Sequence, residues 1–232
     1  MQTVDFNNLD TSIDVYSPIK FDLWLKWSII VPDEHKDQAN TGLSYIDFLL
    51  SSVVDYNRCF MLLLEKNEVN AALPLIRLQA DNLRVLYMEH LYPDKVLPKI
   101  YKDEKELKDI KINGQELNGW FVNGKVNDDF SRFREIYKKY NAYVHPSIKL
   151  HKYLIAGTNI PKPNPFDAAF EAKIDMVYIN KAIIYTLEYI DNYYMSLIHQ
   201  NPDLECKYKE KVEGFEHLDK ILSDISKGYN KQ

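Results

Sequence analysis

The feature that most constrains this fold is the length of its uninterrupted helical segments. Residues 167–199 contain neither Gly nor Pro, and apolar side chains return every three or four positions along them. The whole chain of 232 residues holds only 7 Gly and 10 Pro, so few positions can break a helix. We therefore predict an all-α fold, an antiparallel helical bundle of six to seven helices with a small hairpin or loop insertion.

Apolar spacing and terminating residues give the expected helix boundaries. Ser17-Pro18 predicts the start of the first helix, because an N-cap residue is followed by Pro at the first helical position. The later helices are predicted over residues 41–66, 70–91, 94–106, 128–145, 167–199 and 203–232. Cys59 lies among apolar residues of the second helix and is interpreted as a core residue. Since no domain boundary is visible, residues 1–232 are expected to form a single helical domain.

Residues 108–127 have a different pattern and form the expected insertion. Asn113-Gly114 and Asn123-Gly124 are typical of hairpin turns, and residue types suited to strands flank them. We predict a small hairpin or irregular loop that covers a groove or meets a partner. Its deletion should then leave helicity nearly unchanged, unless Trp120 and Phe121 belong to the core.

Composition and motif spacing exclude several classes of function. The six His residues show no His-x-x-x-His or Glu-x-x-His pair, and no Gly-rich phosphate loop occurs, so we expect no metal and no cofactor. No apolar run is long enough to span a membrane. Two distant Cys residues and a polar, acidic N-terminus favour a cytoplasmic protein. The net charge of −5 does not favour general binding to nucleic acid.

Two polar clusters interrupt these apolar patterns. Arg77, Asp81 and Arg84 lie on one helical face, as either a solvated ion-pair strip or a partly buried network at a cleft. Near the end of the helix at 128–145, the candidate residues are Lys139, Tyr140, Asn141 and His145. A helix C-terminus favours the charged imidazolium, so His145 could serve as a general acid. Alternatively, His145 only caps the helix.

Both clusters carry a resemblance to known proteins. The segments Leu-Pro-Leu-Ile-Arg at 73–77 and Tyr-x-x-Tyr-x-His-Pro-Ser at 140–147 together resemble an uncharacterised group of bacterial helical proteins. The second segment is also similar to the motif of the HEPN superfamily, which has Arg, then a polar residue that is often Asn, then three residues, then His. Asn141 and His145 match this motif, whereas Tyr140 stands where the family has Arg.

The resemblance implies a helical-bundle domain and two hypotheses for its function. Many HEPN proteins are metal-independent RNases of toxin–antitoxin or phage-defence systems. In the first hypothesis the chain is a helical interaction or regulatory protein that binds a partner or small ligand, because a neutral Tyr140 cannot stabilise charge at a phosphate. In the second it is such an RNase, with His145 as general acid and base, Asn141 orienting it and Arg77 binding phosphate. Asp81, Arg84, Tyr140 and Lys139 are then candidate binding residues.

The helix at 167–199 also suggests a homodimer. Beside its apolar row lies a second stripe, formed by Tyr178, Tyr185, Tyr189 and Tyr193. Tyr is enriched at interfaces because it buries a large area and keeps a polar tip. The alternative is that the helix at 203–232 of the same chain covers this stripe. The expected partners are therefore a second copy of the chain and, in addition, a protein or RNA.

Overall fold

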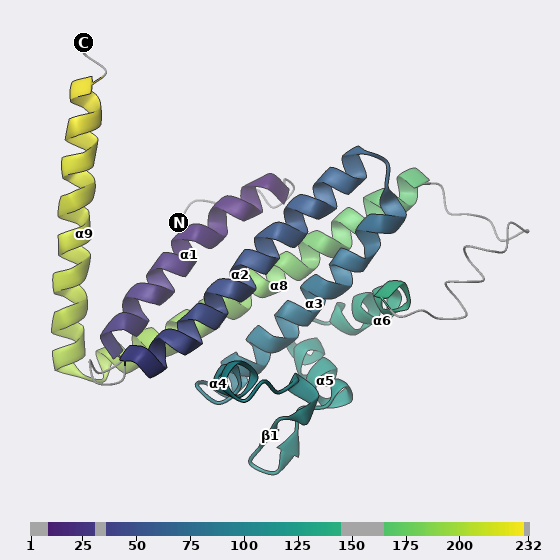
Figure 1. Ribbon diagram of the computed structural model, residues 1–232, viewed down its shortest axis with the longest axis horizontal. Helices are drawn as coiled ribbons and strands as arrows, with labels where there is room; N and C mark the ends of the chain where they lie inside the picture. The colour runs from purple at the N-terminus through teal and green to yellow at the C-terminus, as the bar shows by residue number, and fades with distance from the viewer. Residues whose placement is uncertain (1–8, 31–35, 145–164, 230–232) are drawn as a thin grey trace, which may run out of the picture.

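The chain folds as an all-α bundle in a computed structural model that describes residues 9–30, 36–144 and 165–229 (Figure 1). In these ranges, four long helices form the body: α1 (Leu9–Ile30), α2 (Lys36–Glu65), α3 (Val69–Leu91) and α8 (Pro165–His199). Their buried apolar side chains form one core together with those of the smaller elements. The all-α class predicted from the long helical segments is confirmed.

The four long helices do not all alternate in direction. Short connections make α1 antiparallel to α2 and α2 antiparallel to α3 (Figure 1). In contrast, α8 runs parallel to α3. Gln79 Nε2 donates to Asn180 Oδ1 at 2.8 Å, and the hydroxyl of Tyr194 donates to Asp94 Oδ1 at 3.4 Å, so residue numbers rise together along the two helices. The chain between α3 and α8 therefore returns to the end of the bundle where α3 begins.

Two polar networks inside the bundle tie the long helices together. Asn180 also donates from Nδ2 to Asn57 Oδ1 at 2.9 Å, so an amide chain joins α3, α8 and α2 in the core. Lys26 of α1 is buried and bonds both Asp22 (2.6 Å) and Asp191 of α8 (2.5 Å). Buried polar groups need such partners, so these contacts favour one alignment of the helices over others.

A buried carboxylate connects α3 to α4 (Leu97–Lys102). Glu89 accepts the backbone N–H groups of Asp94 (2.6 Å), Val96 (3.2 Å) and Leu97 (2.8 Å). These are donors at and before the first turn of a helix, which lack partners within the helix itself. Burial raises the pKa of Glu89 to about 7, even though the N–H groups favour its charged form.

The predicted insertion divides into a hairpin and a helix. After a short 3₁₀ turn, η2 (Leu107–Asp109), strand β1 (Lys111–Ile112) pairs antiparallel with β2 (Gln115–Glu116). Asn113 and Gly114 between them have φ of 52° and 83°, as the predicted two-residue turn requires. The hairpin is thus confirmed, but residues Gly119–Asp129 form helix α5. The turn predicted at Asn123-Gly124 was wrong, because apolar residues on one side of this segment are buried.

The insertion also contributes side chains to the core, while the expectation that its deletion leaves helicity nearly unchanged stays a prediction. Its buried side chains are Ile110, Ile112, Leu117, Val122 and Val126. Phe121 packs against this core, whereas Trp120 is 82% exposed. The sequence-based expectation treated Trp120 and Phe121 as one pair, although consecutive helical positions point in different directions.

The remaining helices are α6 (Phe133–Val144) and α9 (Pro202–Tyr229). On α6, Phe133, Ile136 and Tyr140 are buried. In Figure 1, α9 (yellow) extends to one side of the bundle from the end of α8. Its middle contacts α1, where the ring of Phe215 meets that of Phe21 edge-on with centroids 5.0 Å apart.

Two sequence-based assignments need correction. Ser17-Pro18 lies inside α1, which begins at Leu9. Tyr16 is 2% exposed, and its packing in the core supports a helical turn ahead of Pro18. Cys59 is exposed and not a core residue, because the neighbouring Phe60 takes the buried position. No helix in the described ranges is long and apolar enough to cross a membrane.

Candidate functional site

The most connected polar side chain between α3 and α6 is Arg77, which is 6% exposed. Each nitrogen of its guanidinium donates a hydrogen bond. Nε donates to Asn141 Oδ1 at 3.2 Å, Nη1 donates to Asp81 and Nη2 donates to the hydroxyl of Tyr137. Arg77 therefore links its own helix to two residues of α6.

Arg84 completes the same network from the next two turns of α3. Its Nη1 donates to Asp81 Oδ1 at 2.8 Å and to the Tyr137 hydroxyl at 2.7 Å. The Tyr137 ring lies under both guanidinium groups, with its centroid 3.7 Å from Cζ of Arg77 and 5.0 Å from Cζ of Arg84. Tyr137 thus binds both cations through its ring face and its oxygen. We call Arg77, Asp81, Arg84, Tyr137 and Asn141 the arginine cluster.

The arginine cluster carries an excess of positive charge. Two guanidinium groups share the carboxylate of Asp81, whose side chain is 39% exposed. Burial lowers the pKa of Arg77 to about 10, so its guanidinium remains charged at neutral pH, and burial also lowers the pKa of Arg84. Nε of Arg84 is buried without a hydrogen-bond partner among the described residues.

Helical spacing explains how these residues meet. Arg77, Asp81 and Arg84 lie four and three residues apart along α3, and Tyr137 and Asn141 lie four apart along α6. Each set therefore occupies one face of its helix. The structure brings together four of the sequence-predicted residues and adds Tyr137, which was not among them. Its spacing of four residues from Asn141 is the signal that could have identified it.

Lys139 and Tyr140 lie on a different side of α6 and are not part of the arginine cluster. Both bond Asp175 of α8, Lys139 through Nζ at 2.8 Å and Tyr140 through its hydroxyl at 2.8 Å. Asp175 is 2% exposed and also pairs with Arg132 at 2.9 Å, while Lys139 pairs with Glu171 at 2.6 Å. This second network fastens α6 to α8, and it holds the pKa of Lys139 above its ordinary value through its bonds to the two carboxylates, which outweigh burial.

His145 lies outside the described residues, so its predicted position in a common cleft with Arg77 stays a prediction. Asn141, four residues before it, is on the last turn of α6, which ends at Val144. Within the described ranges, no group of three or more His, Cys, Asp or Glu side chains is arranged to hold a metal ion.

Comparisons with known proteins add no relative. A scan against protein-family models, a search of curated proteins and a search of solved structures each found no match for this chain.

Proposed function

We propose that this chain is a helical interaction protein of HEPN-like type that binds a partner and has no intact catalytic site. The observation that supports this most directly is the state of Arg77, whose three nitrogens all donate to side chains of the arginine cluster. A phosphate-binding Arg needs donors directed at the ligand. Three of the five N–H donors of Arg77 are used in this way, and the side chain is only 6% exposed, so an anion could reach the remaining two donors only at a buried position.

The arginine cluster instead has the character of a clamp between α3 and α6. A buried cation is costly unless charge and hydrogen bonds compensate it, and Asp81 and Tyr137 supply both. Tyr140, which replaces the Arg of the HEPN motif, is likewise engaged with Asp175 in the second network. The two positions from which the RNase hypothesis needs a free cation are thus occupied by structural contacts.

The partner that we propose is a second copy of the chain, bound through the Tyr stripe of α8. Tyr185 is 51% exposed and Tyr189 is 40% exposed, so α9 of the same chain leaves much of both rings uncovered. Tyr178 and Tyr193 are half-buried and pack against the core. Large exposed rings at one-turn spacing are typical of interface anchors.

The alternative function, a metal-independent RNase, is favoured by two other observations. Arg77 bonds Asn141, which stands four residues before His145 in the sequence. The arginine cluster also has more cationic than anionic groups, with Nε of Arg84 unbonded among the described residues. In this reading His145 transfers the proton, Asn141 orients it, and the excess charge at Arg77 and Arg84 attracts phosphate.

Incubation of the pure protein with single-stranded and hairpin RNA in EDTA separates the two functions. An interaction protein gives no cleavage above a buffer control, and the variant His145→Ala behaves as the wild type. An RNase gives metal-independent cleavage that falls at least about 100-fold in His145→Ala. His199→Ala, a change at the exposed end of α8, is the matched control and should retain any activity.

A further inference from the structure

A groove away from the arginine cluster lies at the end of the bundle where α2 meets α3. It has a volume of about 370 Å³, which is in the range of small-molecule pockets. Its lining comes from the last turns of α2, the turn that follows, the start of α3 and the first turns of α8: Met61, Leu64, Glu65, Asn67, Val69, Asp167, Ala169, Phe170 and Lys173. We call this the α2–α8 groove.

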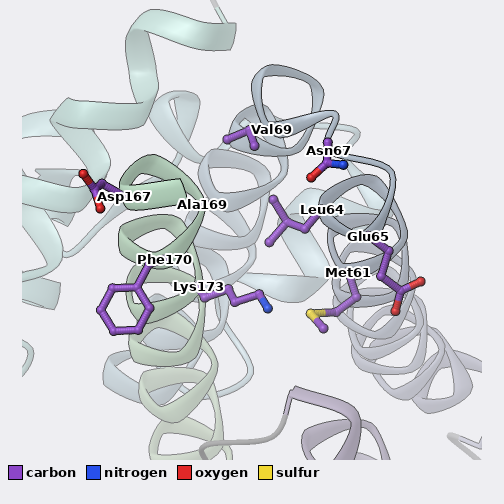
Figure 2. A pocket seen from close by; sticks show the side chains of 9 residues that line it. All are labelled: Met61, Leu64, Glu65, Asn67, Val69, Asp167, Ala169, Phe170 and Lys173. Carbon is purple, nitrogen blue, oxygen red and sulfur yellow. The ribbon is translucent and has the colours of Figure 1, made fainter. Parts of the chain in front are cut away.

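The lining of the α2–α8 groove is mainly apolar, and its polar side chains are Glu65, Asn67, Asp167 and the exposed Lys173. Figure 2 shows Lys173 reaching from α8 towards Met61 and Leu64 of α2, whereas the carboxylates of Glu65 and Asp167 point away from the centre. Lys173 forms no ion pair with any residue that the structure describes, unlike Lys139 on the facing helix α6, which pairs with Glu171 and Asp175. A mainly apolar groove whose ammonium has no ion-pair partner among the described residues is complementary to an apolar molecule with an anionic head.

We propose that the α2–α8 groove binds a small amphipathic carboxylate, with its alkyl or aryl body against Met61, Leu64 and Val69 and its carboxylate on Nζ of Lys173. The volume suits a small molecule, and the charge at Lys173 selects an anion over a neutral or cationic amphiphile. This site is separate from the arginine cluster and from the Tyr stripe, so it does not rest on the function proposed above.

Isothermal titration calorimetry of the full chain with decanoate tests the proposal, with decanol and decyltrimethylammonium as probes of the same apolar length. Decanoate should bind at one site. Decanol and decyltrimethylammonium should each bind at least about tenfold more weakly, because neither can form the charge-assisted hydrogen bond between a carboxylate and Lys173. Lys173→Gln should weaken decanoate binding about tenfold, and Ala169→Phe, which narrows the groove, should weaken it more. Lys207→Gln, at an exposed position of α9, should change nothing.

Circular dichroism melting of each variant establishes that it is folded before titration. If the wild type and Lys173→Gln bind decanoate with equal affinity, the proposal is overturned. It is also overturned if the wild type binds decyltrimethylammonium as tightly as it binds decanoate. The absence of any decanoate heat in the wild type would also overturn it. If Ala169→Phe instead changes the mass in light scattering, the groove holds a second copy of the chain and not a small molecule.

Discussion

At the scale of single residues, the shared carboxylate of Asp81 is the point on which the arginine cluster depends. It is the acidic partner of both Arg77 and Arg84, and both guanidinium groups are largely buried. A buried cation that loses its counter-ion is far more costly than an exposed one. This difference leads to a direct test.

We expect Asp81→Asn to lower the free energy of unfolding by about 2 kcal/mol. This loss is smaller than the loss caused by breaking a fully buried ion pair, because Asp81 is partly exposed. Chemical denaturation followed by circular dichroism measures this. Asp128→Asn is the matched control: Asp128 pairs only loosely with Lys125, at 3.5 Å between exposed side chains, and should cost less than about 0.5 kcal/mol. Equal losses in the two variants would mean that the arginine cluster is not a clamp.

Glu89 gives a second prediction, based on pH. The carboxyl has a pKa of about 7 in the fold and an ordinary value of 4.5, so the folded protein binds this proton more tightly than the unfolded chain does. The protonated Glu89 carboxyl therefore contributes to the free energy of unfolding. This contribution is fully present below about pH 4.5 and is lost as pH rises towards 7, a total change of about 3 kcal/mol in the free energy of unfolding. Denaturation from pH 4 to 8 should show this fall in the wild type, relative to Glu89→Gln, which has no titrating group at this position. Parallel pH profiles for the two proteins would contradict it.

At the scale of elements, the insertion differs most from its prediction, because its second half forms α5 and not a second turn. The hairpin and α5 are both short, but Ile110, Leu117 and Val122 enter the common core. Elements this small have little stability of their own. They hold their shape because the bundle buries one side of them.

A pair of substitutions tests this dependence within the insertion. Leu117→Ala should lower the free energy of unfolding by about 3 kcal/mol, because Leu117 is fully buried and its truncation leaves a cavity. Trp120→Ala removes a larger side chain, but that side chain is 82% exposed, so the cost should stay below about 0.5 kcal/mol. Denaturation curves of both variants check this. The reverse order would show that Trp120 packs into the fold in solution.

At the scale of the whole molecule, the Tyr stripe leads to a prediction about assembly. Light scattering at micromolar concentration should give about twice the chain mass of 27.3 kDa. Replacing Tyr185 and Tyr189 together by Lys should return the mass to that of one chain, because ammonium groups are costly to bury in an interface. Phe48→Lys, at an exposed position of α2, is the control and should remain dimeric. A wild-type mass near 27.3 kDa would end the dimer proposal.

Helical periodicity alone determined much of this protein. The long segments α2, α3 and α8 follow from apolar spacing and the scarcity of Gly and Pro, and the Asn113-Gly114 turn follows from its need for positive φ. The same spacing placed Arg77, Asp81 and Arg84 on one face. These are local properties, set by residues within one or two turns of each other, and so they can be read from sequence.

The tertiary structure decided which faces meet. Asn141 and Lys139 are two residues apart on α6, yet Asn141 bonds Arg77 on α3 while Lys139 bonds Asp175 on α8, because α6 lies against both helices. The burial of residues 119–129 as a helix and the direction of α8 likewise depend on contacts between distant segments. Such contacts form only when the chain has closed on itself, and no local pattern specifies them in advance.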